Sequence, residues 1–198
     1  MFTTLIFSML GYLIGSLCSA VIVCQILKKP DPREGGSGNP GATNVLRLAG
    51  KEAALMTLAS DVFKGLIPVW VAALFGAQGF GLALVGLAAF LGHVYPVFFG
   101  FKGGKGVATG LGVICGLSLF SGLLLVAIWA GVLYFSRYVS LASLVAAAIA
   151  PFLVVWQVGF MAFLVLCAMV GLLAYQHLEN IERLRAGTEF KFTLAGIQ

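Results

Sequence analysis

Long apolar segments constrain the fold of this chain more than any other feature. They cover residues 2–27, 53–77, 79–100, 107–135 and 139–175. A helix of about 20 apolar residues crosses the hydrocarbon layer of a membrane. Only helices and closed barrels satisfy every backbone polar group in lipid, and apolar runs of this length indicate helices. We therefore expect an all-α integral membrane protein.

The composition also indicates lipid as the main solvent around the chain. Hydrophobic residues make up 61% of the 198 residues and charged residues only 10%, whereas a typical soluble domain has about 25% charged residues. We therefore interpret the formal net charge of +5 as charge that anchors and orients the chain at one membrane face. We expect no nucleic-acid partner. The four cysteines lie inside apolar runs without CxxC spacing, so we expect no metal site.

The lengths of the apolar runs predict a polytopic bundle in which some helices are short or broken. The run 139–175 is long for one helix and barely enough for two, and 107–135 is also long for one. Gly92 to Pro96 looks like a break inside the membrane, which is tolerated where helices line a polar site. The run 2–27 has no basic residues before it, so we interpret it as a retained helix rather than a signal peptide.

Basic residues concentrate in three polar stretches, which are residues 28–52, 101–106 and 176–198. The positive-inside rule places all three in the cytoplasm and the N-terminus in the periplasm. This arrangement requires an odd number of crossings. We expect one domain over residues 1–198, ending in a cytoplasmic tail, 178–198, that begins with a short surface helix.

The first polar stretch contains a glycine-rich segment, residues 35–47, with the sequence GGSGNPGATNVLR. Glycines let backbone N–H groups converge on an anion, and a helix that begins near Ala42 would point its positive end at that anion. Further donors are Ser37, Thr43, Asn44 and Arg47. The alternative is a flexible loop, but the convergence of these donors favours an anion site.

The second polar stretch lies within residues 100–109, GFKGGKGVAT, and repeats this chemistry. It is not a P-loop, because Gly106 rather than Ser or Thr follows Lys105. A basic turn that obeys the positive-inside rule is an equal alternative for this stretch alone. A second cationic glycine-rich loop on the same face favours a shared phosphate pocket.

Other polar groups give less specific signals. His177 and Asn180 are three residues apart and would share one face of a helix. His177 is a plausible phosphate donor or general base, and the alternative is a histidine that caps a helix end. Asp61 and Lys64 have the same spacing inside an apolar run. Mutual neutralisation is favoured for this pair over a catalytic role.

Three segments strongly resemble the motifs of the acyl-phosphate-dependent glycerol-3-phosphate acyltransferase (PlsY) family. They are residues 36–47, 92–109 and 177–184, and residues 61–65 also look like the family pattern. The resemblance implies about seven transmembrane helices, a periplasmic N-terminus and a cytoplasmic active site. It implies catalytic roles for Ser37, Arg47, Lys105, His177 and Asn180. It implies substrate-binding positions within the motifs at Gly38, Asn39, Thr43, Asn44, Lys102, Gly103 and Gly104, and outside them at Ser143.

The resemblance also implies the reaction. The acyl chain of an acyl phosphate would pass to the sn-1 hydroxyl of glycerol 3-phosphate, giving lysophosphatidic acid and inorganic phosphate in a bacterial inner membrane. The sequence contains no Ser-His-Asp pattern, HxxxxD pattern or acidic metal cluster. We therefore expect no acyl-enzyme intermediate, cofactor or metal, and a monomer surrounded by membrane lipids. The proton acceptor is left open between His177 and a substrate phosphate.

Two alternative functions remain from the residues alone. A transporter for a small organic phosphate would also use cationic glycine-rich loops, but it is expected to have paired repeats, and none is visible. A scaffold for lipid-synthesising enzymes would have no phosphate pocket.

Overall fold

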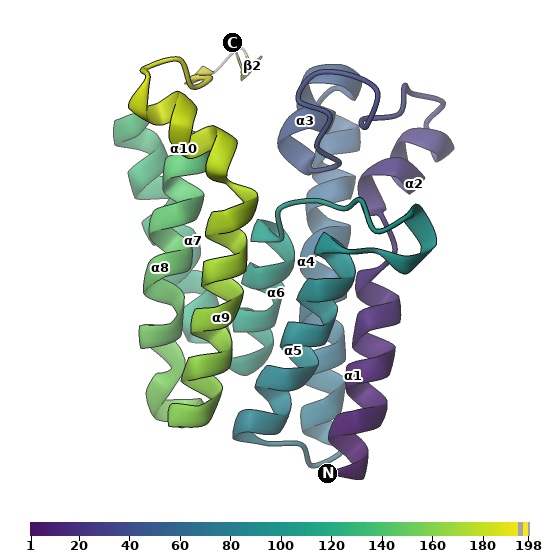
Figure 1. Ribbon diagram of the computed structural model, residues 1–198, viewed down its shortest axis with the longest axis vertical. Coiled ribbons are helices and arrows are strands. Elements are labelled where there is room, and N and C mark those ends of the chain that lie inside the picture. Colours follow the sequence, from purple (N-terminus) through teal and green to yellow (C-terminus); the bar gives the residue numbers. More distant parts are fainter. Residues whose placement is uncertain (194–195, 198) are drawn as a thin grey trace.

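The computed structural model describes residues 1–193 and 196–197, which form a bundle of helices (Figure 1). The elements are α1 (Phe2–Gly15), α2 (Ser19–Ile26), α3 (Ala42–Ala49), α4 (Lys51–Leu74), α5 (Gly79–Val94), the 3-10 helix η1 (Val97–Phe99), α6 (Val107–Leu117), α7 (Leu119–Ser136), α8 (Val139–Val158), α9 (Phe160–Gln176), α10 (Leu178–Arg185), β1 (Phe192–Thr193) and β2 (Gly196–Ile197). The two short strands pair antiparallel at the end of the tail. Apart from this pair, the described chain has the expected helical architecture.

The helices include enough apolar segments to cross a membrane several times. Four segments qualify alone, namely α4, α5 continued through η1, α7 and α8. The pairs α1–α2 and α9–α10 qualify as bent units, with bends of 44° and 60°. The apolar helix α6 has only 11 residues. The expectation of a polytopic helical bundle with some short or broken helices is confirmed, with four to six candidate spans and α6 as a shorter apolar helix.

Small residues let the central helices approach one another closely. A Cβ atom on Gly15 of α1 would lie 2.1 Å from the carbonyl oxygen of Ala89 on α5. A Cβ atom on Gly65 of α4 would lie 2.1 Å from Thr109 O on α6. One on Gly112 of α6 would lie 2.0 Å from Val62 O on α4. Such backbone contact is the usual basis of helix association in lipid, where apolar side chains gain little by clustering.

The first apolar run is broken, which the sequence did not indicate. We expected a single retained helix over residues 2–27, but α1 ends at Gly15 and α2 begins at Ser19. The Ser16 hydroxyl donates to Tyr12 O at 2.8 Å and accepts from Val97 N at 3.3 Å. The break therefore has partners outside α1, as backbone irregularities inside a membrane protein require.

A buried ion pair supports the same break. Lys64 Nζ lies 2.8 Å from Asp61 Oδ1 and donates a hydrogen bond of 2.9 Å to Leu17 O. Both charged side chains are almost fully buried. The expected mutual neutralisation of Asp61 and Lys64 is observed, and it also satisfies the carbonyl group that the helix break leaves free.

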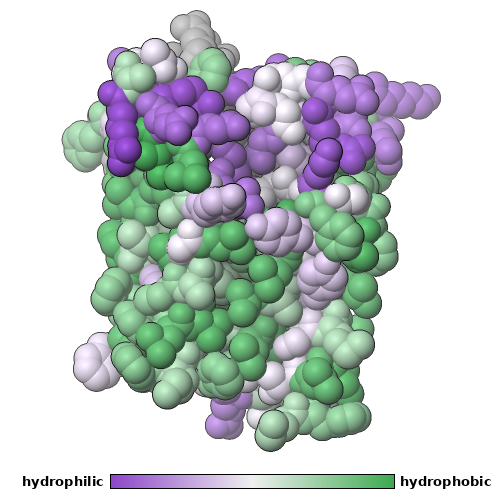
Figure 2. Space-filling model, viewed as in Figure 1, coloured by the Kyte–Doolittle hydropathy of each residue, from purple (hydrophilic) through white to green (hydrophobic). Residues whose placement is uncertain are grey.

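The charged residues gather at one end of the bundle. Figure 2 shows hydrophilic residues over the end formed by α2, α3 and α10, and mainly hydrophobic residues along the sides. Asp61 and Lys64 are the charged side chains that lie within the bundle instead. In Figure 1 the N-terminus lies at the opposite end from α10 and the tail. The loop between η1 and α6 is recessed below α3 and α10.

Candidate active site

One cavity of about 410 Å³ lies beneath this hydrophilic end. Its polar mouth is lined by α3 and the loop before it, the start of α6, and the α10 helix with its tail. Its deeper walls come from α4, α5, α6, α7, α8 and α9 and are mainly apolar, with Asp61, His93 and Ser143 among the polar exceptions. The cavity therefore combines a site for a polar group with space for a hydrocarbon chain.

Asn44 organises the first glycine-rich loop. Its Oδ1 accepts from Ser37 N at 3.0 Å, and its Nδ2 donates to Pro32 O at 2.8 Å and Gly35 O at 3.0 Å. A Cβ atom on Gly36, whose φ is +61°, would lie 2.2 Å from Asn44 Oδ1. The amide of Asn44 is therefore used to shape the loop around Ser37.

Two helices begin at the mouth of the cavity. Helix α3 begins at Ala42, where the sequence predicted a helix start, and α6 begins at Val107. The first turns of both helices line the cavity. Among the described residues, no side chain caps either N-terminus. Their free N–H groups and the positive ends of their dipoles are suited to an anion.

The second glycine-rich loop is packed against the end of α5. Gly103 N donates to Val94 O at 3.1 Å, and Gly104 N donates to His93 O at 3.2 Å. A Cβ atom on Gly103 would lie 1.9 Å from His93 O. These glycines are needed for the close packing of the loop against α5. This packing places Lys105 in the lining of the cavity.

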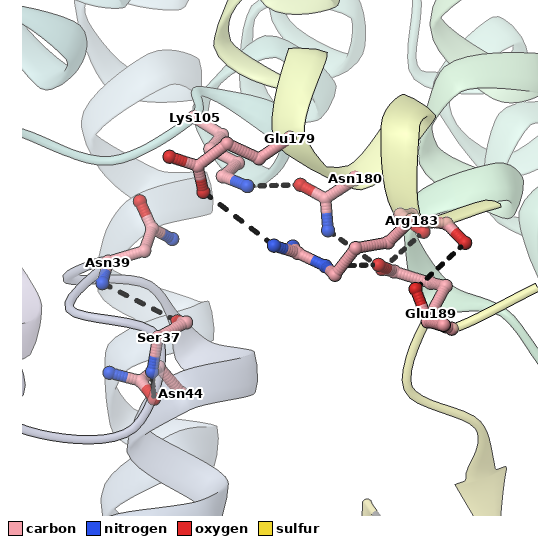
Figure 3. Close-up of polar contacts among 10 residues, drawn as sticks. Ser37, Asn39, Asn44, Lys105, Glu179, Asn180, Arg183 and Glu189 are labelled. Carbon is pink, nitrogen blue, oxygen red and sulfur yellow. Dashed lines mark hydrogen bonds and ion pairs between the residues drawn. The ribbon is translucent and has the colours of Figure 1, made fainter. Parts of the chain in front are cut away.

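Asn180 links Lys105 to the C-terminal tail (Figure 3). Lys105 Nζ donates to Asn180 Oδ1, and Asn180 Nδ2 donates to Glu189 Oε1 at 2.7 Å. The Glu189 carboxylate also accepts from Ser140 Oγ at 2.8 Å and Arg183 Nε at 2.8 Å. In Figure 3, this group lies across from Ser37, Asn39 and Asn44 of the first loop.

Two cations at the mouth are partly withdrawn from water. Burial, followed by the nearby Arg183 guanidinium, lowers the pKa of Lys105. Burial also lowers the pKa of Arg47, whose guanidinium lies 4.3 Å from the centre of the Phe190 ring. Charges in such surroundings act on an anion more strongly than they would in water.

His177 has a defined tautomer. Its Nδ1 lies 2.8 Å from Leu173 O. A carbonyl oxygen can only accept, so Nδ1 carries the hydrogen and Nε2 is an acceptor when the ring is neutral. His177 is buried and lines the cavity.

The apolar part of the cavity begins close to Ser143. The Ser143 hydroxyl accepts from Trp129 Nε1 at 3.2 Å and donates to Val139 O at 2.8 Å. Beyond it, the lining is apolar as far as Ala150 on α8. Leu58 of α4 and Val126 of α7 line the cavity and are also exposed, with exposed fractions of 43% and 44%. The cavity therefore reaches the lipid-facing surface.

Most of the residues that the sequence singled out meet in this cavity. Those that line it are Ser37, Asn39, Thr43, Asn44, Arg47, Lys105, Ser143, His177 and Asn180. Those outside the lining are Gly38, Lys102, Gly103 and Gly104. Lys102 is exposed, whereas Gly103 and Gly104 support the loop through the packing described above.

The predicted site residues do not include four residues that line the mouth, namely Ser140, Arg183, Glu189 and Phe190. Arg183 lies one turn after Asn180 on α10, so helical spacing could have found it. Glu189 and Phe190 lie in the tail after α10. No periodic pattern places such a tail over a cavity.

The fold and the site define a helical membrane protein with cationic and helix N-terminal groups above an apolar groove. A family model described as glycerol-3-phosphate acyltransferase matches residues 5–187. The chain belongs to the glycerol-3-phosphate acyltransferase family.

Individual relatives agree with this assignment. A glycerol-3-phosphate acyltransferase of Albidiferax ferrireducens is 52% identical over 192 residues, which cover 92% of this chain and 86% of the relative. One from Vibrio cholerae is 48% identical over 181 residues, covering 91% and 86%.

Two crystal structures of PlsY (YgiH), an integral membrane glycerol 3-phosphate acyltransferase, have the same fold. The glycerol 3-phosphate form has a TM-score of 0.90 and 42% identity, covering 97% of this chain and 96% of that one. The lysophosphatidic acid form has a TM-score of 0.87 and 40% identity, with coverage of 98% and 97%.

Proposed function

We propose that this protein transfers an acyl chain from an acyl phosphate to the sn-1 hydroxyl of glycerol 3-phosphate. The products would be 1-acylglycerol 3-phosphate, which is lysophosphatidic acid, and inorganic phosphate. The observation that carries the proposal is the cavity of about 410 Å³, in which a cationic, glycine-framed mouth continues into an apolar groove. Family membership and the forms named for the two PlsY structures support the acceptor and the product.

The polar mouth would hold the phosphate groups. Arg47 and Lys105 would supply the charge, while Ser37 and Asn180 would supply neutral polar contacts. The N-termini of α3 and α6 would add backbone N–H groups. Because all these groups come from one chain, we propose that a monomer is sufficient.

The reaction would need no nucleophile from the protein. An acyl phosphate is a mixed anhydride with a good leaving group. The sn-1 oxygen would attack the carbonyl carbon, and the bond from that carbon to the phosphate oxygen would break. The fixed cations would stabilise the negative charge that develops on the carbonyl oxygen and the leaving phosphate. The protein would contribute mainly orientation, which lowers a barrier by about 7–11 kcal/mol in well-oriented cases.

The acyl chain would lie in the apolar groove. From Ser140 to Ala150, helix α8 advances about 15 Å at about 1.5 Å per residue. Lining residues Leu58 and Val126 are exposed on the lipid-facing surface, so a donor could enter sideways from the bilayer while glycerol 3-phosphate enters from water.

An assay of the purified protein in detergent tests the function directly. With an acyl phosphate and glycerol 3-phosphate, we expect lysophosphatidic acid and one phosphate per product. An acyl thioester supplied in place of the acyl phosphate should give no product, because the mouth is proposed to act on a phosphate leaving group. Absence of product with the acyl phosphate, or equal rates with both donors, would contradict the proposal.

Replacement of Arg47 or Lys105 by Ala should lower kcat/KM by at least about 10-fold. Loss of one hydrogen bond to a charged group costs about 1.5–3 kcal/mol, and about 1.4 kcal/mol corresponds to a factor of ten. Matched controls are Arg185→Ala and Lys51→Ala, because both residues are exposed outside the cavity. Near parental kcat/KM in Arg47→Ala and Lys105→Ala would remove both residues from the mechanism.

The attacking hydroxyl must lose a proton, and two acceptors are available. We propose that a substrate phosphate oxygen takes it, since the second pKa of a phosphate monoester lies near 6. His177 Nε2 would then accept a hydrogen bond from the hydroxyl and orient it. His177→Gln keeps an amide acceptor but cannot titrate, so turnover should stay substantial and the pH profile should resemble that of the parent. A fall of about 10²–10⁴-fold with little change in KM would identify His177 as the base.

We propose that the protein spans the inner membrane with its hydrophilic end in the cytoplasm. The chain has 12 lysine and arginine residues. Apart from Lys64, and from Lys51 at the first residue of α4, they belong to the loops, short helices and tail of that end. The positive-inside rule places such an end in the cytoplasm, which leaves the N-terminus in the periplasm.

Single cysteines in a background without Cys18, Cys24, Cys115 and Cys167 test this orientation. An impermeant thiol reagent added to intact cells should leave Lys102→Cys and Thr188→Cys unlabelled. It should label Gln78→Cys, which is exposed in the turn at the opposite end. After cell disruption, the reagent should label all three. The reverse pattern in intact cells would show that the orientation is wrong.

A further inference from the structure

We infer that Glu189 is a positioning residue, which acts through Asn180 and Arg183 to fix the cationic groups at the mouth of the cavity. The inference rests on the proposed function. It extends the site to the tail beyond α10, which the sequence motifs did not identify. Glu189 is not assigned a contact with substrate.

The first observation is the burial and bonding of the Glu189 carboxylate. Its side chain is only 6% exposed. One oxygen accepts from Ser140 at 2.8 Å and from Asn180 at 2.7 Å, and the other accepts from Arg183 Nε at 2.8 Å. These partners lie on α8 and α10. The carboxylate therefore joins two helices at the mouth.

The second observation concerns the direction of the Asn180 amide. A carboxylate can only accept hydrogen bonds, so the NH₂ group of Asn180 must face Glu189. The carbonyl oxygen of the amide then faces the opposite side, where Lys105 Nζ donates to it. An ammonium group has no acceptor, so a reversed amide would place donor against donor. Glu189 thereby determines the Asn180 orientation that holds Lys105.

The third observation is the electrostatic balance around Lys105. The charged groups near its ammonium are Arg183, Glu179 and Glu189, and the titratable His177 also lies close. Burial opposes ionisation of Glu189, but hydrogen bonds from Arg183, Asn180 and Ser140 lower its pKa overall. Glu189 is therefore an anion at neutral pH. Its negative charge raises the pKa of Lys105, against burial and Arg183, which lower it.

Phe190, which follows Glu189, contacts two other cations at the mouth. The Phe190 ring centre lies 4.3 Å from the Arg47 guanidinium carbon and 5.9 Å from that of Arg183. Phe192 N donates to Arg137 O at 2.7 Å and so fastens the tail to the turn between α7 and α8. The segment 189–190 is consequently held where it constrains cations from both sides of the mouth.

A double-mutant cycle separates positioning from a general structural role. Glu189→Gln and Asn180→Ala are assayed singly and together with acyl phosphate and glycerol 3-phosphate. Glu189→Gln should lower kcat/KM by about 10–100-fold, because a misplacement of about 1 Å can cost about 10²-fold. If Glu189 acts through Asn180, the double variant should be little worse than Asn180→Ala. Independent, multiplying effects would overturn the inference.

The pH profile supplies a second readout. Loss of the Glu189 anion should lower the pKa of Lys105, so the alkaline limb of kcat/KM should move to lower pH. Glu182→Gln, an exposed carboxylate on α10, should leave both kcat/KM and the limb unchanged. A parental alkaline limb and parental kcat/KM in Glu189→Gln would overturn the inference. An equal loss of kcat/KM in Glu182→Gln would also overturn it, because the loss would then follow from net charge alone.

The reactivity of Lys105 tests the inference without the assay of activity. If the parent makes no lysophosphatidic acid, the proposed function fails, and acetylation of lysines by acetic anhydride then tests the inference alone. Lys105 should react faster in Glu189→Gln than in the parent, with exposed Lys102 as the internal reference; equal rates would overturn the inference.

If Glu189→Gln does not fold, Ser140→Ala offers a milder variant, because it removes one hydrogen bond to Glu189. The Ser140→Ala variant should show the same changes to a smaller extent, and a parental profile would overturn the inference.

Discussion

The buried Asp61–Lys64 ion pair is the interaction on which the other parts of this structure depend. Lys64 satisfies the Leu17 carbonyl at the break between α1 and α2. Asp61 lies 3.5 Å from His93 Nδ1, and the His93 backbone accepts from Gly104. One ion pair thus connects the first helix break to the loop before Lys105. Removing one partner would leave an uncompensated charge, which typically costs about 3–5 kcal/mol in a protein interior.

The depth of the polar mouth follows from the lengths of α5 and α6. Because both helices stop short of the hydrophilic end, their connecting loop lies below α3 and α10 (Figure 1). This places Lys105 directly above the apolar groove rather than out in solvent. Close packing of Gly103 against His93 O makes that depth possible. A reaction that joins a water-soluble acceptor to a lipid donor needs this meeting of polar and apolar space.

The sequence was sufficient to predict those parts of the fold that depend on local composition. Apolar length predicted the membrane bundle, and the glycine-rich run predicted the start of α3 at Ala42. The break at Ser16 was missed because its partners, Val97 and Lys64, are distant in sequence. Asn44 lines the cavity as predicted, and tertiary structure adds a second role, since its amide shapes its own loop. Glu189 was missed because its position over the cavity depends on tertiary contacts alone.

The partners of Lys105 indicate how the mouth keeps its charge available. A carboxylate in direct contact would orient the ammonium but would also neutralise it and compete with a phosphate. An amide oxygen, supplied here by Asn180, orients the ammonium without cancelling its charge. The Glu189 carboxylate lies one hydrogen bond further along, on the far side of Asn180. There it accepts hydrogen bonds from Ser140, Asn180 and Arg183. Fixed dipoles next to the cation and a remote counter-charge form a preorganised site, in which little reorganisation is needed when a phosphate binds.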